Sequence, residues 1–475
     1  MLAKLSILLN YLRVVCKKTK KLYIMTKTQK LLNDNPAIRW TALVLIALMM
    51  FFAYMFVDVL SPLSTLLETT KGWSAETYGT FCSSEYFLNV FAFFLIFAGI
   101  ILDKMGIRFT GILSGAVMVI GASIKLFAIS EYFTPDSSLY QFLGSFWTSF
   151  PATAKLASLG FMIFGCGVEM AGVTVSKAIA KWFKGKEMAL AMGLEMAIAR
   201  LGVFAVFRLS PALSTWANEA MPTVVTPVLF CTILLVIGLL TYTVFTFMDK
   251  KLDAQIGETA SDESEEQFKV SDIGILFTSK TFLIVSGLCV LYYSAIFPFQ
   301  KFATGMLEAN LQMPTEEAAG LFSWFPIGAM VLTPFLGAFL DKKGKGASML
   351  IMGAILMITC HLVFALVPLT KPIAYAAIIL LGVSFSLVPA ALWPSVPKLV
   401  EERYLGSAYS VIFWIQNIGL MAFPIIIGWS LDKTGGYTVP MLIFSSLGVA
   451  ALVLGLWLKV EDKKKGYGLE LPNIK

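Results

Sequence analysis

Charged residues are scarce in this chain. Only 14% of the 475 residues are Asp, Glu, Lys or Arg, whereas soluble domains carry roughly a quarter. Hydrophobic residues make up 57%. A soluble protein of this length would need several buried cores and a far more polar surface. The composition therefore excludes a soluble globular protein and favours a membrane protein.

Histidine and paired cysteine are also nearly absent. The chain has one His, and its six Cys are scattered, mostly inside apolar runs, without a Cys-x-x-Cys pair. No nucleophile motif or phosphate-binding loop is found, and one His offers little for acid–base chemistry. We therefore expect no enzyme activity, no catalytic residue, no metal and no cofactor.

What the sequence does have is twelve apolar runs of about 20 residues, the length that crosses a hydrocarbon core. They predict an all-α membrane protein with twelve transmembrane helices in two six-helix bundles. The expected spans are 40–67, 79–102, 108–130, 153–180, 187–212, 222–248, 279–304, 317–340, 347–369, 372–397, 405–430 and 437–459. The expected domains are a basic N-terminal tail 1–38, an N-terminal bundle 39–248, a flexible acidic linker 249–277, a C-terminal bundle 278–460 and a C-terminal tail 461–475.

Lys and Arg near the span ends predict the orientation, because cytoplasmic loops carry an excess of them. The N-terminal tail, the even-numbered span ends and the C-terminal tail hold most of these residues. Both termini are expected in the cytoplasm, and this bias explains the net charge of +7 without nucleic acid. Residues 5–16 are too short to span; they form either an interfacial helix on anionic lipid or a segment that precedes a start at Met25.

One phrase, Gly-x-x-Leu-Asp-Lys-x-Gly, occurs three times, each time after an apolar run. The copies cover 99–106, 337–344 and 428–435. Each predicts a helix that leaves the bilayer and turns on its last Gly. The first two copies lie half a chain apart, which indicates two related halves. The third follows span 11 on the outer face, so we expect it to be a reused helix end rather than a latch.

The repeated phrase resembles the loop signature of the major facilitator superfamily, Gly-x-x-x-Asp-Arg/Lys-x-Gly-x-Arg/Lys. The copy that contains Asp103 is complete, with Arg108 at the last basic position. The copy that contains Asp341 has Lys345 next to that position. The resemblance implies alternating access, with Asp103, Arg108 and Asp341 in the gating of the inner side.

Further segments resemble the lysosomal dipeptide-transporter branch of that family, and the chain is expected to be a bacterial relative. They are WFKGKE at 182–187, Gly193-Leu194, Ala199-Arg200, Tyr292-Tyr293, FPF at 297–299, ALWP at 391–394, LGSAY at 405–409 and QNIGL at 416–420. The branch carries an acid in helix 4 and an Arg in helix 5 at its dipeptide site, which implies Glu169 and Arg200. It also has an Asp in helix 1 where this chain has Asp58, and a Gln where this chain has Glu195.

The depth of charged residues in the spans identifies the same pair, because a charge near the bilayer midplane marks a pathway or a site by default. Glu169 lies 12 residues before Lys181, and Arg200 lies 13 residues after Glu187. Both are thus about 20 Å from the cytoplasmic face. Either they form a structural ion pair, or Arg200 binds a substrate carboxylate while Glu169 binds an ammonium.

Other polar residues extend the candidate set. Asp58, Glu85 and Arg208 lie nearer the outer face, either as gating or proton-coupling groups or as charges solvated at the mouth. Glu195 is a further candidate for proton coupling. In the second half, the residues expected to contact the substrate are Tyr292, Tyr293, Gln416 and Asn417, and Trp393 is expected at a gate because prolines flank it.

We therefore expect a transporter of a small polar solute, a dipeptide or similar zwitterion, in the bacterial cytoplasmic membrane. Uniport and proton coupling both remain open, as does an accessory subunit. The alternatives are a proton-coupled carrier of a small organic anion and a non-transporting membrane receptor on the same fold. The expected partners are the small-molecule substrate, membrane lipids and, in the coupled case, protons.

Overall fold

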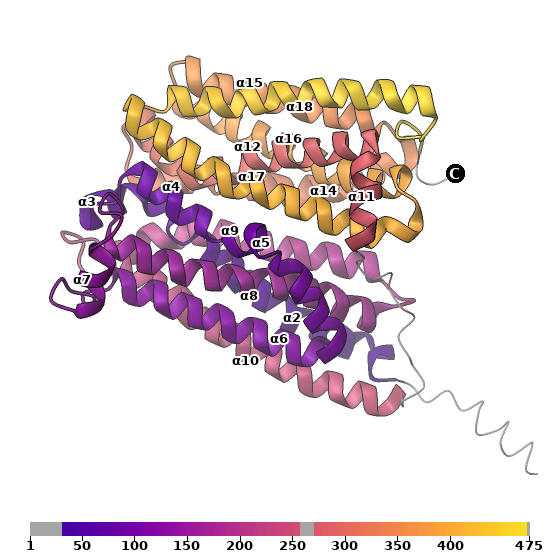
Figure 1. Ribbon diagram of the computed structural model, residues 1–475, viewed down its shortest axis with the longest axis horizontal. Coiled ribbons are helices and arrows are strands. Elements are labelled where there is room, and N and C mark those ends of the chain that lie inside the picture. The colour runs from indigo at the N-terminus through magenta and orange to yellow at the C-terminus, as the bar shows by residue number, and fades with distance from the viewer. Residues whose placement is uncertain (1–30, 257–269, 473–475) are drawn as a thin grey trace, which may run out of the picture.

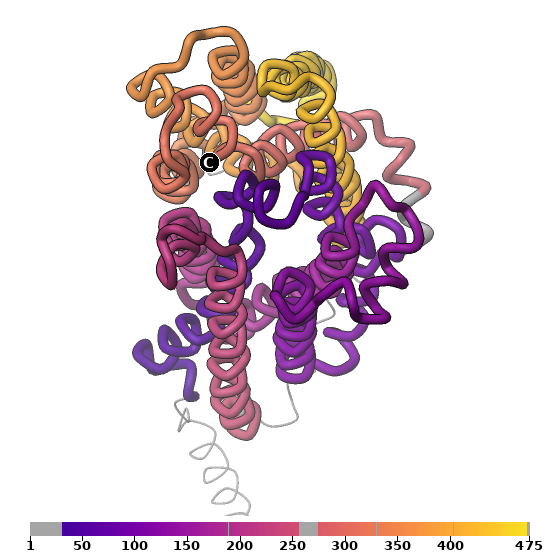
Figure 2. Tube along the Cα trace, turned by 90° about the vertical axis from the view of Figure 1, so that its left-hand side faces the viewer, coloured from indigo at the N-terminus to yellow at the C-terminus, as the bar shows by residue number. Residues whose placement is uncertain are grey.

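The computed structural model describes residues 31–256 and 270–472, and every regular element in these ranges is helical. The two predictions about residues 1–30 concern the segment 5–16 and the start at Met25, and both lie outside the described ranges. Figure 1 shows the helices of the first half, indigo to magenta, packed together below those of the second half, orange to yellow. Figure 2 shows the same two groups of helices from the side.

The first half consists of two short 3-10 turns, several short helices and the long helices that cross the bundle. Its elements are η1 (Leu32–Asp34), α2 (Pro36–Asp58), η2 (Ser61–Leu63), α3 (Ser64–Lys71), α4 (Ala75–Ser84), α5 (Phe87–Phe91), α6 (Phe94–Ile129), α7 (Ser138–Gly144), α8 (Ala152–Phe183), α9 (Met188–Thr215) and α10 (Val225–Ile256).

The second half repeats the alternation of long helices. Its elements are α11 (Val270–Thr278), α12 (Lys280–Leu311), α13 (Thr315–Phe322), α14 (Trp324–Lys343), α15 (Gly346–Leu366), α16 (Lys371–Leu399), η3 (Glu402–Tyr404), α17 (Leu405–Thr434) and α18 (Thr438–Lys465). Across the described residues, eleven helical segments are long and apolar enough to cross a membrane.

The predicted span 79–102 is the one that does not appear among these eleven, because its helix is interrupted twice. The first interruption follows Ser84 and the second falls at Phe93, whose φ is +51°. Residues of neighbouring helices contact the backbone carbonyl groups at these interruptions. The indole of Trp414 donates to the Val90 carbonyl, 3.0 Å away, and Gly165 of α8 lies so close that a Cβ would meet the Glu85 carbonyl oxygen at 2.2 Å. An interrupted helix at membrane depth is tolerated where protein surrounds it.

The predicted linker 249–277 also differs from the structure at both ends. Helix α10 continues to Ile256, and α11 begins at Val270. Asp249 explains the extension of α10, because its buried carboxylate accepts a hydrogen bond from the Trp182 indole at 2.9 Å and pairs with Lys181 at 2.9 Å. The described ends of this segment are therefore helical rather than flexible.

The turn on the last Gly of each repeated phrase is confirmed. Gly106, Gly344 and Gly435 have φ values of +75°, +73° and +66°, a region that only Gly enters at no steric cost. Gly106 bends α6 between its two parts, whereas the other two cap the C-terminal ends of α14 and α17. The phrase therefore ends a membrane-crossing segment each time.

The third phrase does more than end a helix, which corrects our expectation for it. We call the end of the molecule that holds the described chain termini the terminal end, and the opposite end the distal end (Figure 1). At the distal end, the Asp432 carboxylate of α17 accepts hydrogen bonds from the backbone N–H groups of Ala75, at 3.0 Å, and Glu76, at 2.9 Å. It thus caps α4 of the other half, where a negative charge is favoured by the helix dipole.

Two glycines allow α4 and α17 to pack backbone to backbone beside this cap. A Cβ on Gly79 would lie 2.1 Å from the Pro424 carbonyl oxygen, and a Cβ on Gly428 would lie 2.2 Å from that of Ala75. Such approaches are typical of small-residue interfaces between membrane helices. We call Ala75, Glu76, Gly79, Gly428 and Asp432 the distal clasp.

We expect Gly79→Ala to destabilise the protein, because the added methyl group would force the two helix backbones apart. Overpacking of this kind costs about 1–3 kcal/mol, so the midpoint of thermal unfolding in detergent should fall. Gly99→Ala is the matched control, since a Cβ at Gly99 meets nothing within 4 Å and Ala is the better helix former by about 1 kcal/mol. Equal midpoints for both variants would contradict the close packing.

Candidate functional site

Arg200 lies between the two halves, surrounded by aromatic rings. Its guanidinium carbon is 5.8 Å from the ring centroid of Tyr54 on α2, 5.2 Å from Phe297 on α12 and 5.4 Å from Phe385 on α16. We call these three rings the aromatic cage. Cation–π contact of this kind stabilises a guanidinium at a depth where water is scarce, so the cage holds the charge without neutralising it.

Glu169 on α8 is half-buried, and a polar side chain from the other half of the chain acts on it. The Asn417 side chain on α17 lies beside the carboxylate. Among the described residues, no carboxylate oxygen lies within 4 Å of the Arg200 guanidinium, so the predicted ion pair of Glu169 with Arg200 is not formed in this conformation. Two opposite charges therefore stand at the interface between halves without cancelling each other.

Glu195 lies on the same helix as Arg200, and the positive charge of Arg200 acts on its carboxylate. It is half-buried. A spacing of five residues turns the two side chains well apart around the helix, and the described residues contain no ion pair between them within 4 Å. Glu195 thus lies near Arg200 without forming an ion pair with it.

Tyr293 and Trp393 extend the aromatic cage within the second half. The Trp393 indole donates to the Tyr293 hydroxyl at 3.1 Å, and the Tyr293 ring packs on Phe297, with centroids 5.5 Å apart. Trp393 also stacks on Phe413 at 4.9 Å. Tyr293 therefore packs on a ring of the aromatic cage, and Trp393 joins the same aromatic wall through Tyr293.

Tyr292 and Gln416 are turned away from this region. The Tyr292 hydroxyl donates to the Leu350 carbonyl of α15, and the Tyr292 ring is fully buried. The Gln416 amide oxygen accepts from the Cys289 thiol at 3.3 Å. Consecutive helical residues project about 100° apart, so Tyr292 cannot face the site that Tyr293 faces. In this conformation Tyr292 and Gln416 bond within the second half, and their contact with a substrate stays a prediction.

Asp58 lies in a buried polar network that joins the halves. Its carboxylate pairs with Lys301 of α12 at 2.9 Å and accepts from Gln300 at 2.6 Å and from Ser61 at 2.9 Å. Lys301 and Gln300 were not among the predicted site residues. The available signal was that Lys301 falls inside the expected span 279–304, where a charge marks a site by default.

Glu85 and Lys125 are two further buried charged groups near Asp58. The Lys125 ammonium of α6 lies 4.4 Å from the ring centroid of Phe56, 4.4 Å from Phe161 and 5.1 Å from Phe81. In the described part of the chain, Lys125 Nζ and Glu85 Oε2 have no hydrogen-bond partner. Sequence reasoning found Glu85 and missed Lys125, although Lys125 also lies inside an expected span.

Arg208 is exposed and joins the halves at another point. Its Nε donates to the Ser323 hydroxyl, which follows α13, at 2.9 Å. The structure does not bring it to Asp58, so the predicted group of Asp58, Glu85 and Arg208 divides. Asp58 and Glu85 share one charged region, whereas Arg208 makes a separate contact between the halves.

Two of the predicted gating residues at the terminal end, Asp103 and Arg108, form ion pairs within the first half. Asp103 pairs with Lys177 of α8 at 2.8 Å. Arg108 lies 3.3 Å from Asp253 and 3.8 Å from Asp249, both on α10. Asp341 lies near the C-terminal end of α14. These ion pairs join helices of the first half to each other. Asp249 takes part in them, although the sequence predicted that it lies in the linker.

A second set of ion pairs at the terminal end fixes the start of α9. Arg39 pairs with Glu187 at 2.8 Å, and Lys186 pairs with Asp34 at 2.9 Å. The hydrogen bond from Lys186 lowers the pKa of the Asp34 carboxyl below its usual value. Lys186 and Asp34 meet solvent, so their pair contributes little to stability. Arg39 is buried, and only its partner Glu187 is half exposed.

Comparison with known proteins identifies the family of the chain. The model of the Major Facilitator Superfamily matches residues 46–424. The chain is 26% identical over 376 residues to the lysosomal dipeptide transporter MFSD1 of Bos taurus, with 78% of this chain and 75% of the relative covered. It is 29% identical over 307 residues to the Gallus gallus protein of the same name, with 63% and 68% covered.

Solved structures share the fold. The nucleoside transporter NupG superimposes with a TM-score of 0.65 at 13% identity and covers 88% of this chain and 99% of its own. A D-xylose-proton symporter superimposes with a TM-score of 0.64 at 12% identity and covers 89% and 96%. The fold class and the family resemblance predicted from the sequence are thus confirmed.

We expect Lys301→Ala to destabilise the protein strongly, because it would leave Asp58 buried without its cation. Breaking a buried pair costs about 3–5 kcal/mol, measurable as a fall in the thermal unfolding midpoint in detergent. The double variant Asp58→Asn/Lys301→Met should recover much of the loss, since neither charge remains.

The matched control is Lys371→Ala, which removes the exposed partner of Glu317. Exposed pairs contribute about 0–1 kcal/mol, so its midpoint should stay near that of the unmodified protein. Similar losses for Lys301→Ala and Lys371→Ala would contradict the importance of the buried pair.

Proposed function

Because the chain belongs to the Major Facilitator Superfamily and is a membrane transporter of small solutes, we propose that its cargo is a dipeptide or a similar zwitterion. The observation that carries the proposal is the separation of Glu169 from Arg200. The carboxylate faces Asn417, and the guanidinium faces the aromatic cage. A solute with an ammonium at one end and a carboxylate at the other complements both groups.

The chemistry of the two groups sets the orientation of the solute. The planar guanidinium of Arg200 donates two parallel hydrogen bonds to a carboxylate, which an ammonium does not match. Glu169 receives the ammonium of the solute, and the Asn417 amide adds a neutral hydrogen bond beside it. The aromatic cage supplies an apolar wall that tolerates side chains of different sizes. The relatives named as dipeptide transporters support the same substrate class.

Alternating access is the mechanism that we propose for this site. The contacts that join the halves toward the distal end include the distal clasp, the pair of Asp58 with Lys301, and the bond from Arg208 to Ser323. All three must break for the site to open to the distal side. A rocking motion of the two halves about the central site is the way in which such repeats exchange access.

We further propose that both termini face the cytoplasm of a bacterial cell and that the protein lies in its cytoplasmic membrane. The excess of Lys and Arg at the terminal end supports this orientation. The distal clasp then lies on the outer side.

The second candidate function is a proton-coupled carrier of a small organic anion. Glu85 and Lys125 favour it, because both are buried titratable groups without a hydrogen-bond partner among the described residues. Such a carrier requires Arg200 for the anion but no contact between Glu169 and the substrate. Proton coupling of dipeptide transport would use the same groups, so the two candidates differ in the substrate and in the role of Glu169.

We expect Arg200→Ala and Glu169→Ala to abolish dipeptide uptake into proteoliposomes, because each removes the group that neutralises one end of the solute. Arg200→Lys should retain a small part of the uptake, since a Lys keeps the charge but loses the paired hydrogen bonds. Uptake of a labelled dipeptide is the measurement, with reconstituted protein quantified in each vesicle preparation.

Arg403→Ala serves as the control for loss of a positive charge. Arg403 is exposed and pairs with Glu401 near the terminal end, so uptake should match that of the unmodified protein. Full transport by both Arg200→Ala and Glu169→Ala would refute this site. Ligand-induced thermal stabilisation without accumulation in vesicles would instead identify a non-transporting receptor.

A substrate screen separates the two candidate functions. Dipeptides, monocarboxylates and sugars are offered to proteoliposomes with and without an imposed pH gradient. We expect dipeptides to be transported, and a dependence of their accumulation on the gradient would identify proton coupling. Accumulation of monocarboxylates alone, retained in Glu169→Gln, would favour the anion carrier and exclude the proposed one.

A further inference from the structure

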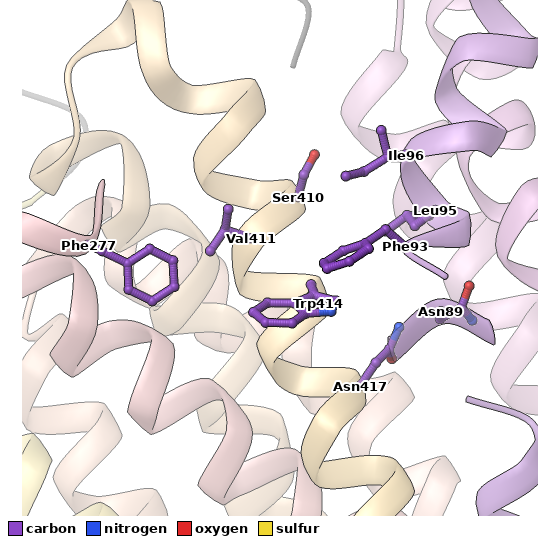
Figure 3. Close-up of a pocket in the computed structure, with 9 residues that line it drawn as sticks. All are labelled: Asn89, Phe93, Leu95, Ile96, Phe277, Ser410, Val411, Trp414 and Asn417. Carbon is purple, nitrogen blue, oxygen red and sulfur yellow. The ribbon is translucent and has the colours of Figure 1, made fainter. Parts of the chain in front are cut away.

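A cavity of about 260 Å³ lies between the two halves, beside the interrupted helix. Figure 3 shows Asn89 of α5 and Leu95 and Ile96 of α6 on one side of α17, and Phe277 of α11 on the other side of α17. Whole drug-sized ligands occupy cavities of roughly 300–1,000 Å³. The volume therefore suits one side chain of a ligand better than an entire ligand.

Two amides form the polar end of this cavity. Asn89 and Asn417 both line it and lie at the same end in Figure 3. The Asn89 side chain is only 2% exposed, and its Oδ1 has no hydrogen-bond partner in the described residues. Asn417 is also the side chain that lies beside the Glu169 carboxylate. The cavity thus begins where the proposed ammonium site ends.

The body of the cavity is apolar and held in place from both halves. The rings of Phe93 and Trp414 stack with their centroids 5.3 Å apart. Trp414 is fixed by its hydrogen bond to the Val90 carbonyl at 3.0 Å. Val411, one helical turn from Trp414, is buried and forms part of the floor. Such a surface favours an aliphatic or aromatic side chain over a polar one.

We propose that this cavity binds the side chain of the residue that carries the free amino group of the substrate. The inference rests on the proposed function. In a dipeptide, the ammonium and the first side chain are attached to the same carbon atom. An ammonium at Glu169, beside Asn417, therefore brings the first side chain to the mouth of the cavity. The second side chain lies toward Arg200, because the carboxylate binds there.

The consequence is selectivity for the order of residues in the peptide. Phe-Ala and Ala-Phe have the same composition, but only Phe-Ala presents its aromatic ring to the cavity. Val411→Phe would fill the cavity from its floor. It should raise the KM for Phe-Ala about tenfold or more, in line with the loss of a buried aromatic contact, and leave the KM for Ala-Phe and Ala-Ala unchanged.

Val411→Ala provides a second test that avoids overpacking. It enlarges the cavity, so the preference for Trp-Ala over Phe-Ala should rise relative to the unmodified protein, with Ala-Trp and Ala-Phe as the reversed controls. Val449→Phe is the matched control for the substitution itself, since Val449 is 49% exposed on α18, and its KM values should not change. All measurements use reconstituted full-length protein.

The outcomes separate this inference from the function on which it rests. If the unmodified protein carries no dipeptide, the proposed function fails and the inference fails with it. If dipeptides are carried but Val411→Phe affects Phe-Ala and Ala-Phe equally, only the inference is overturned. If neither KM changes in Val411→Phe or Val411→Ala, the cavity has another occupant, such as a lipid acyl chain, and the inference is also overturned.

Discussion

The buried ion pair between Asp58 and Lys301 is the contact on which the closed distal end depends. It joins α2 of the first half to α12 of the second, and both side chains are almost completely excluded from solvent. In such a place each charge is stable only while the other compensates it. The halves therefore cannot part there unless water or another partner reaches both groups, which makes distal opening a transition between two states rather than a gradual loosening.

The candidate site follows the opposite principle. Arg200 is held by ring faces and Glu169 by an amide, so neither charge is compensated by the other. A zwitterionic solute then has no protein ion pair to break before it binds. The same arrangement limits the solutes that fit, because a ligand with one charge would leave the second group facing an apolar surrounding. Separation of the two charges thus leaves both groups free to bind a zwitterion and disfavours ligands with a single charge.

The sequence predicted the architecture well because span length and glycine turns have simple physical causes. A run of about 20 apolar residues fixes a crossing, and the last Gly of each phrase does adopt a positive φ. Depth along the chain also singled out Glu169 and Arg200, and in the structure each has a neighbour from the second half. Depth does not give the rotation of a residue about the helix axis. The sequence therefore did not predict that Tyr293 faces the cage while Tyr292 faces α15.

Contacts between distant helices were the other part that sequence reasoning missed. Asp432 was taken for a helix end because nothing in the sequence indicates that α4 begins beside it. The positions of Lys125 and Lys301 inside expected spans are visible in the sequence. Their partners, three Phe rings for Lys125 and Asp58 for Lys301, are visible only in the structure. Asp249 was assigned to a linker because its charge resembles those that follow, while its burial depends on Trp182.

Helix α17 connects these features physically. Asn417 lies at the proposed ammonium site, Trp414 and Val411 line the cavity, and Asp432 caps α4 at the distal end. Fifteen residues separate Asn417 from Asp432, about 22 Å along a helix. Pro424 lies between them, where the backbone of α17 meets Gly79, and a Pro within a helix is a point at which the axis can bend. A single helix therefore joins the proposed ammonium site to the distal clasp, and Pro424 is the point between them at which its axis can bend.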